Sequence, residues 1–362
     1  MMNNFDKTSN IKLDFNDILI QPAITTNIES RSQVNPFDKN GMLPIFTAPM
    51  DTVVDNINYT DFYRNKINVC LPREKKYLPL HSFKNFSSLS LDEFIKTYIN
   101  ETCVFSHSMN PWSGMLCENK HYVLIDIANG HMKKMLTAVS EAKKKYGDSL
   151  FIMAGNVAHP GAYKALSDAG ADAIRVGIGN GNGCLTTQQT GIGYPMATLI
   201  RECYYQSLSL VSPALIVADG GMKNYSDMIK AIALGADYVM VGSLLNKCLE
   251  SCGETMLFNY IRINPYSDFA RLVFDMGFKI TKRFRGMSTK EVQKDWGSEQ
   301  IKTSEGVIRV RPVEYTLSQW TTNFEDYLRS AMSYTNSKTL EEFRGNVELN
   351  VISEQSFQRF NK

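Results

Sequence analysis

Residues 150–157 (LFIMAGNV) and 173–179 (AIRVGIG) decide the fold of this chain. Each segment is a continuous apolar run that ends in glycine or a polar residue. Such runs, without alternation of polar and apolar residues, are typical of strands buried on both faces in a parallel sheet. A short segment with helical periodicity, residues 161–168, separates the two runs. Together they predict a strand–helix–strand unit.

The same unit recurs along the chain. Helical segments separate the later strands. Further strands are expected at 45–50, 67–71, 103–108, 122–128, 214–219 and 238–242, and further helices at 132–146, 194–209 and 226–234. Eight strands with helical crossovers favour an α/β fold, a (β/α)8 TIM barrel, over the alternative of a doubly wound sheet.

The barrel predicts a single domain over residues 1–362, with additions after the eighth strand. Residues 254–315 are irregular, charged and aromatic, and they are too long for a simple connection, so we expect a lid or flap there. Residues 323–346 predict two closing helices, 323–335 and 339–346. The second is expected to begin with a capping box formed by Thr339 and Glu342.

Composition excludes several classes of protein. The chain has 362 residues, 43% of them hydrophobic, and a net charge of only +2, so it lacks the basic field of a nucleic-acid-binding protein. No apolar stretch is long enough for a transmembrane helix, and the N-terminus does not resemble a signal peptide. The seven cysteines form no Cys-x-x-Cys pair, which argues against disulfide and zinc frameworks. We therefore expect a cytoplasmic protein.

A cysteine in residues 175–187 (RVGIGNGNGCLTT) is the candidate nucleophile. Glycines let the backbone turn and let a ligand approach closely, and an accessible thiol can act in covalent catalysis. A buried structural cysteine is the alternative, but the polar neighbours argue against it.

Polar residues at strand ends are often ordinary caps, yet barrel enzymes place their active sites there. Five such residues are Asp126, Asn156, Cys184, Asp219 and Ser243.

Two glycine-rich segments suggest a phosphate site. Residues 219–221 (DGG) and 242–243 (GS) follow the seventh and eighth strands, where barrels bind phosphate with backbone N–H groups. Asp219 is placed to accept hydrogen bonds from two ribose hydroxyls. Plain glycine turns are the alternative. Residues 285–288 (RGMS) could align with a purine edge. The glycines at 177–181 do not have the spacing of a dinucleotide-binding fingerprint, and residues 184–187 follow where its helix should begin.

These and other motifs resemble the inosine monophosphate dehydrogenase and guanosine monophosphate reductase superfamily over nearly the whole chain. The motifs are 13–19 (LDFNDIL), 30–32 (SRS), 48–53 (APMDTV), 155–157 (GNV), the Cys184 loop, 219–221 (DGG), 286–288 (GMS) and 328–330 (LRS).

Within this superfamily the chain is more similar to the reductases. The segments that indicate this are 126–130 (DIANG), 153–157 (MAGNV), 190–195 (TGIGYP) and 304–306 (SEG). The lid is short and has no Arg-Tyr pair, which dehydrogenases use to activate water, and no regulatory pair of CBS-type domains is recognisable. The resemblance implies NADPH-dependent reduction of GMP to IMP and ammonia. Alternatives are an NAD-dependent IMP dehydrogenase that forms XMP, a catalytically silent purine-nucleotide sensor and, more distantly, a flavin-dependent barrel.

The resemblance also implies roles for residues, and a homotetramer. Cys184 would attack the purine, and Thr186 with Glu305 would deliver a proton. The nucleotide would contact Asn182, Asp219, Gly220, Gly221, Gly242, Ser243, Gly286, Met287, Ser288, Lys302 and Gly306. The dinucleotide would contact Ser30, Arg31, Asp126, Ile127, Ala128 and Ser330. The carbonyls of Gly179 and Gly181 could line a potassium site.

Several positions depart from the family pattern. Asn182 stands where the family has a phosphate-binding Ser, and Phe284 stands near a phosphate-binding Tyr of dehydrogenases. Gly183, Leu185 and Thr187 also differ from the usual loop. Residues 71–73 (LPR) replace a His-Lys segment that meets the dinucleotide in reductases, and residues 48–50 (APM) resemble dehydrogenases. The choice of cofactor and of substrate therefore stays open.

Overall fold

The computed structural model describes residues 11–73, 85–100, 120–296 and 303–360. Its centre is a sheet of eight parallel strands in the order β2-β9-β8-β7-β6-β5-β4-β3. The strands are β2 (Ile45–Thr47), β3 (Cys70–Leu71), β4 (Phe86–Leu89), β5 (His121–Asp126), β6 (Leu150–Val157), β7 (Ala173–Val176), β8 (Leu215–Asp219) and β9 (Tyr238–Val241).

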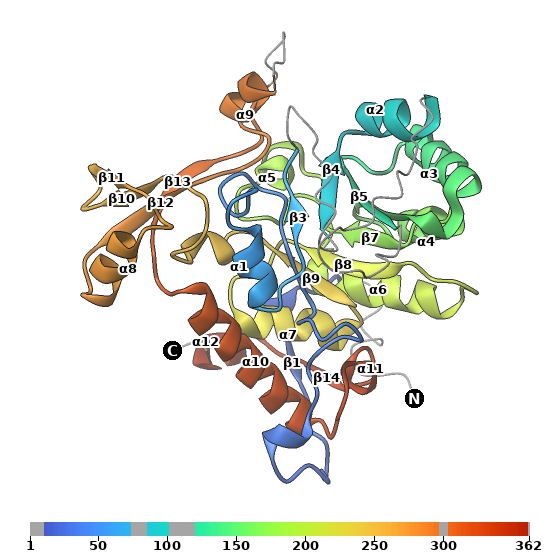
Figure 1. Cartoon of the computed structure of the whole chain (residues 1–362). Helices are drawn as coiled ribbons and strands as arrows, with labels where there is room; N and C mark the ends of the chain where they lie inside the picture. The colour runs from blue at the N-terminus through green and yellow to red at the C-terminus, as the bar shows by residue number, and fades with distance from the viewer. Residues whose placement is uncertain (1–10, 74–84, 101–119, 297–302, 361–362) are drawn as a thin grey trace, which may run out of the picture.

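The sheet closes on itself. Asn68, just before β3, forms a parallel bridge with Phe46 of β2. The N–H of Asn68 donates to the carbonyl of Ile45 at 3.0 Å, and the N–H of Thr47 donates to the carbonyl of Asn68 at 2.9 Å. The predicted (β/α)8 barrel is therefore confirmed, and the doubly wound sheet is excluded (Figure 1).

Helices follow the strands, and most of them cover the outside of the barrel (Figure 1). They are α1 (Tyr59–Arg64), α2 (Leu91–Phe94), the π-helical η4 (Ile95–Asn100), α3 (Lys133–Tyr146), α4 (Pro160–Asp168), α6 (Met196–Leu208) and α7 (Tyr225–Leu234). The short α5 (Thr186–Thr190) lies instead at the end of the barrel where the strands finish. Alternate strand residues face inward and outward. The inward ones fill the barrel, and they are Phe46, Ala48, Cys70, Phe86, Leu124, Met153, Ala173, Val217 and Met240.

Two expectations need correction. The predicted strand 103–108 lies outside the described residues, and the place between β3 and β5 belongs to β4, residues 86–89 (FSSL). β4 is short and half polar, so its hydrophobic signal is weak; its Ser88 hydroxyl donates to the carbonyl of Leu71 at 2.6 Å. The second correction concerns residues 186–190, which we did not expect to begin a helix but which form α5.

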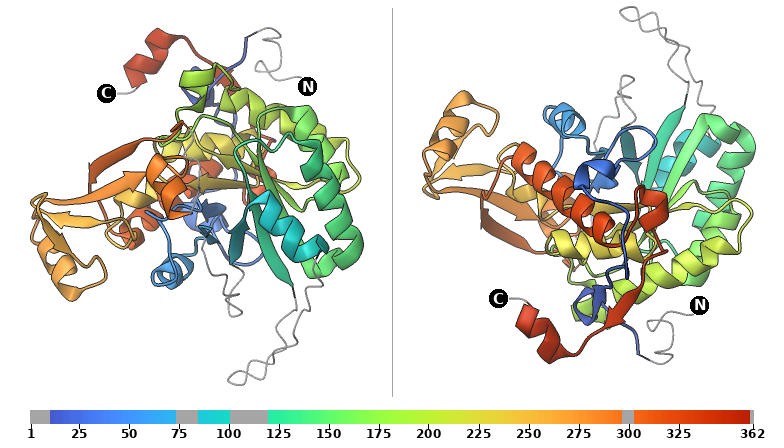
Figure 2. Two further views of the ribbon diagram at one scale, coloured as in Figure 1. Left: turned by 90° about the horizontal axis from the view of Figure 1, so that it is seen from above. Right: turned by 90° about the horizontal axis from the view of Figure 1, so that it is seen from below.

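The flap is an ordered antiparallel sheet that projects from one side of the barrel, rather than an irregular segment (Figures 1 and 2). Its strand order is β11-β10-β12-β13. A small core of its own includes Leu249, Leu257, Ala270, Val273 and Ile280. Its elements are β10 (Thr255–Leu257), β11 (Ile261–Ile263), α8 (Asp268–Asp275), β12 (Ile280–Arg285), α9 (Lys290–Asp295) and β13 (Ile308–Pro312).

The two ends of the chain meet below the barrel. There β1 (Ile18–Ile20) pairs with β14 (Leu349–Val351), and α10 (Leu317–Tyr334) packs on η3 (Arg31–Gln33) and on α7, as the view from below in Figure 2 shows. The remaining elements are η2 (Phe15–Asp17), η5 (Gly147–Ser149), η6 (Leu245–Lys247), α11 (Leu340–Phe343) and α12 (Glu354–Phe360).

The closing helices differ in detail from the prediction. The first, α10, begins six residues earlier than expected, at Leu317. The expected capping box of α11 is only half formed: the Thr339 hydroxyl accepts from the N–H of Glu342, but the Glu342 carboxylate accepts from the N–H of Lys338. In the described part of the chain, no helix has the length and apolar character needed to cross a membrane.

Candidate active site

A cavity of about 580 Å³ opens at the carboxyl ends of the barrel strands. The loops after β2, β5, β6, β7, β8 and β9 form its wall, and flap residues cover one side. All five polar strand-end residues line it: Asp126, Asn156, Cys184, Asp219 and Ser243. A second cavity, of about 670 Å³, lies between residues 21–27 and 335–348 and contains no predicted site residue.

The cysteine loop connects β7 to α5 and is tightly packed. Gly179 has a φ of +78°, and a Cβ there would lie 1.8 Å from the Thr187 hydroxyl oxygen, so only glycine fits. The N–H of Cys184 donates to the carbonyl of Gly181 at 2.9 Å. Backbone contacts also join the loop to the end of the flap, because Cys184 forms an antiparallel bridge with Gly306. The flap therefore sets the position of the cysteine.

The thiol is the first group of a short hydrogen-bonded chain. The Cys184 Sγ lies 3.1 Å from the Thr186 Oγ1, and that hydroxyl donates to the Glu305 Oε2 at 2.5 Å. A hydroxyl can accept one proton and donate another, so it can relay a proton between its two neighbours. Glu305 is 119 residues from Thr186 in sequence, and the flap brings it there.

Cys184 differs from the other described cysteines. Cys70, Cys203 and Cys248 are buried, and burial raises the pKa of each thiol, which keeps them protonated and unreactive. Cys252 is half-buried, its Sγ donates to the carbonyl of Asp51 at 3.2 Å, and burial raises its pKa as well. Cys184 is half-buried and lines the cavity. It is thus the described thiol that a ligand in the cavity can meet.

Arg175 organises the floor of the cavity. Its Nη1 donates to Asp126 at 2.6 Å, and its Nη2 and Nε donate to Asp219 at 2.6 and 3.1 Å. Burial acts to lower the pKa of Arg175, but attraction to Asp219 and Asp126 outweighs burial, and the pKa is raised. The Asn156 amide also donates to Asp219, at 2.7 Å. We did not predict this role; a single arginine in the apolar strand AIRV was the available signal.

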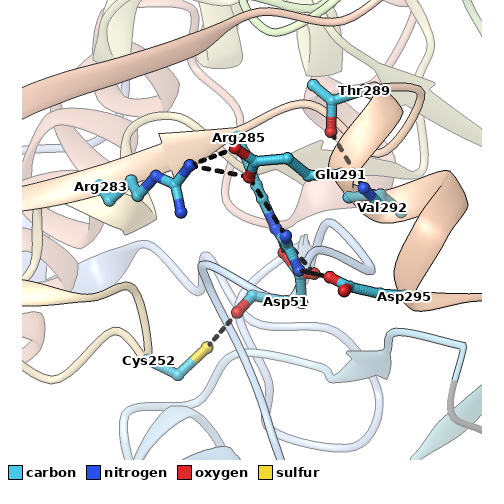
Figure 3. Close-up of polar contacts among 8 residues, drawn as sticks. All are labelled: Asp51, Cys252, Arg283, Arg285, Thr289, Glu291, Val292 and Asp295. Atoms are coloured by element: carbon cyan, nitrogen blue, oxygen red, sulfur yellow. Dashed lines mark hydrogen bonds and ion pairs between the residues drawn. The ribbon is translucent and has the colours of Figure 1, made fainter.

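An ion-pair cluster holds the flap against the barrel (Figure 3). Arg285 of β12 donates through Nε to Asp51, in the loop after β2, at 3.1 and 3.2 Å, and pairs with Asp295 of α9 at 2.8 Å. The hydrogen bond to Asp51 raises the pKa of Arg285. Arg283 donates twice to Glu291, at 2.7 and 2.8 Å. The cluster adjoins Met50 and Gly286 in sequence, and both of these line the cavity.

Most of the predicted site residues lie around this one cavity. Those that line it are Asp126, Ile127, Ala128, Gly179, Gly181, Asn182, Cys184, Thr186, Asp219, Gly220, Gly221, Gly242, Ser243, Gly286, Met287, Ser288 and Glu305. Gly306 contributes its backbone bridge to Cys184. Lys302 lies outside the described residues.

Three predicted cofactor contacts do not line the cavity. Ser30 and Arg31 lie at η3, which packs against α10, the helix that carries Ser330. In Figure 1, α10 lies below the barrel, whereas α5 and α9 lie above it. Conversely, Arg73 and Trp296 line the cavity without having been assigned a role, and the Arg73 guanidinium lies 4.8 Å from the Trp296 ring centre. Residues 71–73 were noted only as a departure from the family pattern.

The fold and the cavity define a class of (β/α)8-barrel proteins in which a cysteine on the loop after one strand faces a ligand-binding cavity under a flap. The sequence profile described as the IMP dehydrogenase / GMP reductase domain matches residues 12–360. The chain therefore belongs to this family.

Both dehydrogenases and reductases are found among the relatives of this chain. The chain is 35% identical to an inosine-5'-monophosphate dehydrogenase of Chlorobaculum parvum over 224 residues, 62% of this chain and 44% of the relative. It is 29% identical to a GMP reductase of Buchnera aphidicola over 366 aligned positions, 97% of each chain, and 27% identical to mouse GMP reductase 2, over 92% of each. The chain thus spans about half the length of the dehydrogenases but nearly all of the reductases.

Proposed function

We propose that this protein is a purine nucleotide oxidoreductase that converts GMP to IMP and ammonia with NADPH. The observation that carries the proposal is the hydrogen-bonded chain Cys184–Thr186–Glu305 at the wall of the cavity. It combines a nucleophile with a route for the proton that a departing amine requires. Membership of the family supports a purine mononucleotide as substrate.

The nucleotide would lie across the cavity. Asp219 is held by Arg175 and Asn156 through one carboxylate oxygen, Oδ2. The other oxygen, Oδ1, takes no part in these bonds and would accept hydrogen bonds from the ribose hydroxyls. Backbone N–H groups at 220–221 and 242–243 would hold the phosphate, and residues 286–288 of the flap would run along the purine edge.

In the first step, the Cys184 thiol gives its proton to Glu305 through Thr186, and the sulfur attacks C2 of the purine and forms a C–S bond. The same proton is then delivered to the exocyclic amine, the C2–N bond breaks with its electron pair going to nitrogen, and ammonia leaves. A nicotinamide dinucleotide, when bound, would supply a hydride to the same carbon. The C–S bond then breaks, the electron pair returns to sulfur, and C2 of the product carries hydrogen in place of the amine.

The residues on the other side of the cavity are suited to a dinucleotide. The Arg73 Nε is buried and has no hydrogen-bond partner among the described residues, although it lies 3.6 Å from Asp126. A buried donor of this kind favours an additional anionic or polar ligand. Arg73, Trp296 and residues 126–128 would hold the cofactor. Ser30, Arg31 and Ser330 could contribute only from a second copy of the chain, in keeping with the predicted homotetramer.

A potassium ion is compatible with the cysteine loop. Among the described residues no cluster of three His, Cys, Asp or Glu side chains could hold a metal, so a cation there would depend on carbonyl oxygens. The carbonyl of Gly181 accepts one hydrogen bond, from Cys184, which leaves a second lone pair. Gly179 and Gly181 would hold the ion and stiffen the loop.

The cytoplasmic location of the protein stays a prediction.

Two incubations test the proposal. With GMP and NADPH, absorbance at the nicotinamide band should fall and ammonia should appear; with IMP and NAD, absorbance should not rise. The reverse result would establish the second candidate, IMP dehydrogenase, which the 35% identity to dehydrogenases favours. The sequence contains no Arg-Tyr dipeptide that could activate water in that reaction. Tight nucleotide binding without turnover in either direction would identify a sensor.

A further inference from the structure

Two arginines of the flap, Arg309 and Arg311, contact residues that line the cavity at the end where the phosphate would bind. Arg309 and Arg311 are alternate residues of β13 and so project from the same face of the strand. In the register of the flap sheet, Arg309 is opposite Phe284 of β12, and opposite residues share a face. Phe284 is 1% exposed and lines the cavity. Both arginines therefore project from the same face of the flap as Phe284, where Arg309 is exposed and Arg311 is half-buried.

Each arginine contacts the wall of the phosphate end. The Arg309 Nη1 donates to the side-chain oxygen of Asn182 at 3.0 Å. The Arg311 guanidinium lies 4.5 Å from the centre of the Phe284 ring, and its Nη1 makes a long hydrogen bond, 3.5 Å, with the carbonyl of Ser243. Asn182, Phe284 and Ser243 all line the cavity. A phosphate held at residues 220–221 and 242–243 is therefore close to both guanidinium groups.

Among the described residues, neither of the two charges is part of an ion pair. Within the described residues, neither Arg309 nor Arg311 has a carboxylate at ion-pair distance. On the same sheet, Arg283 has one and Arg285 has three. Burial and the neighbouring charge of Arg309 lower the pKa of Arg311, and together they outweigh the opposite effect of Glu314. Two like charges placed together at a cavity favour the binding of an anion, which removes their repulsion.

The contacts also coincide with two departures from the family pattern. The resemblance implies a phosphate-binding Ser in the family and, in its dehydrogenases, a phosphate-binding Tyr. Here Asn182 stands at the first position and Phe284 near the second, and Phe284 has no hydroxyl. Arg309 contacts Asn182, and Arg311 contacts Phe284. We propose that Arg309 and Arg311 bind the phosphate of the nucleotide in place of these two hydroxyls. This inference rests on the proposed function, since it takes a purine mononucleotide as the ligand.

Arginine and hydroxyl side chains bind a phosphate in different ways. Arginine carries a permanent charge and binds a phosphate dianion through charge-assisted hydrogen bonds, whereas a hydroxyl offers one neutral donor. We therefore expect binding to depend strongly on the phosphate and to weaken as ionic strength rises.

Calorimetric titration of single and double variants tests the proposal. Arg311→Ala should weaken GMP and IMP binding about 10- to 100-fold, the range for a hydrogen bond to a charged group. Arg309 is exposed, so Arg309→Ala should cost only about 2- to 5-fold. Neither change should alter the affinity for guanosine or inosine, which lack the phosphate.

Arg262→Ala is the matched control. Arg262 lies on β11 of the same flap sheet, its side chain is 77% exposed, and its charged partner is Glu254 at 3.9 Å. Its removal changes the net charge equally but should leave nucleotide affinity unchanged. Adding Asn182→Ser and Phe284→Tyr to the double arginine variant should restore part of the lost affinity. Thermal melts establish that each variant is folded.

The outcomes separate this inference from the proposed function. Equal nucleotide affinity in the parent and the double arginine variant, or an equal loss of nucleoside affinity, would overturn the phosphate role. Binding of inorganic phosphate that depends on the arginines, without binding of GMP or IMP, would support the anion site and refute the purine substrate. A parent protein that binds neither phosphate nor nucleotide would overturn both.

Discussion

Replacing Arg175 with Met should destabilise the protein. The Arg175 side chain is 7% exposed and holds Asp126 and Asp219, each of which is 16% exposed. Methionine is unbranched and apolar and can occupy much of the space of the arginine stem, so the main loss is electrostatic. Removing one partner of a buried ion pair costs about 3–5 kcal/mol.

The surroundings place the expected cost at the lower end of that range. Asp219 keeps its hydrogen bond from Asn156, at 2.7 Å, and Asp126 keeps Arg73 at 3.6 Å. We therefore expect a loss of about 3 kcal/mol in the free energy of unfolding. An unfolding entropy of about 2.1 cal/mol/K per residue over 362 residues is about 0.76 kcal/mol/K, so Tm should fall by about 4 °C.

Thermal and urea unfolding measure this effect. In the variant, Asp126 and Asp219 stay buried but have lost the cation that bridges them, which is the origin of the expected cost. Adding Asp126→Asn and Asp219→Asn removes both carboxylates and should recover most of the loss. A variant as stable as the parent, or a triple variant no more stable than Arg175→Met alone, would refute the reasoning.

Four further predictions concern the site. Cys184→Ala should abolish turnover and leave nucleotide affinity nearly unchanged in calorimetry; residual activity would exclude the covalent mechanism. Asp219→Ala should weaken nucleotide binding by about 1.5–3 kcal/mol, and an unaltered dissociation constant would remove it from the ribose site. Glu305→Gln should slow ammonia release in single turnovers about 10²- to 10⁴-fold, whereas a parent-like rate would contradict the proton path through Thr186. Rates should be higher in potassium than in tetramethylammonium, and equal rates would argue against a cation at Gly179.

Local patterns in the sequence were enough to predict the barrel and the position of its cavity. A strand buried on both faces has to be apolar along its length, so β6 and β7 are recognisable without any partner. The polar residues that follow such strands lie at one end of a parallel barrel by geometry alone. Asp126, Cys184 and Asp219 could therefore be assigned to one cavity in advance. The exception, β4, has two serines in four residues and carries too little of this signal.

Tertiary structure decided which side chains act together. Thr186 meets Glu305, and Arg175 meets Asp219, only because strands and flap from distant parts of the chain converge. The contact of Arg309 with Asn182 depends likewise on the register between β12 and β13. A hydrophobic pattern records the burial of each residue separately, and this is a local property. The partner of a charged or hydroxyl side chain depends on how the closed barrel and the flap bring distant segments together. No single segment of the sequence contains that information.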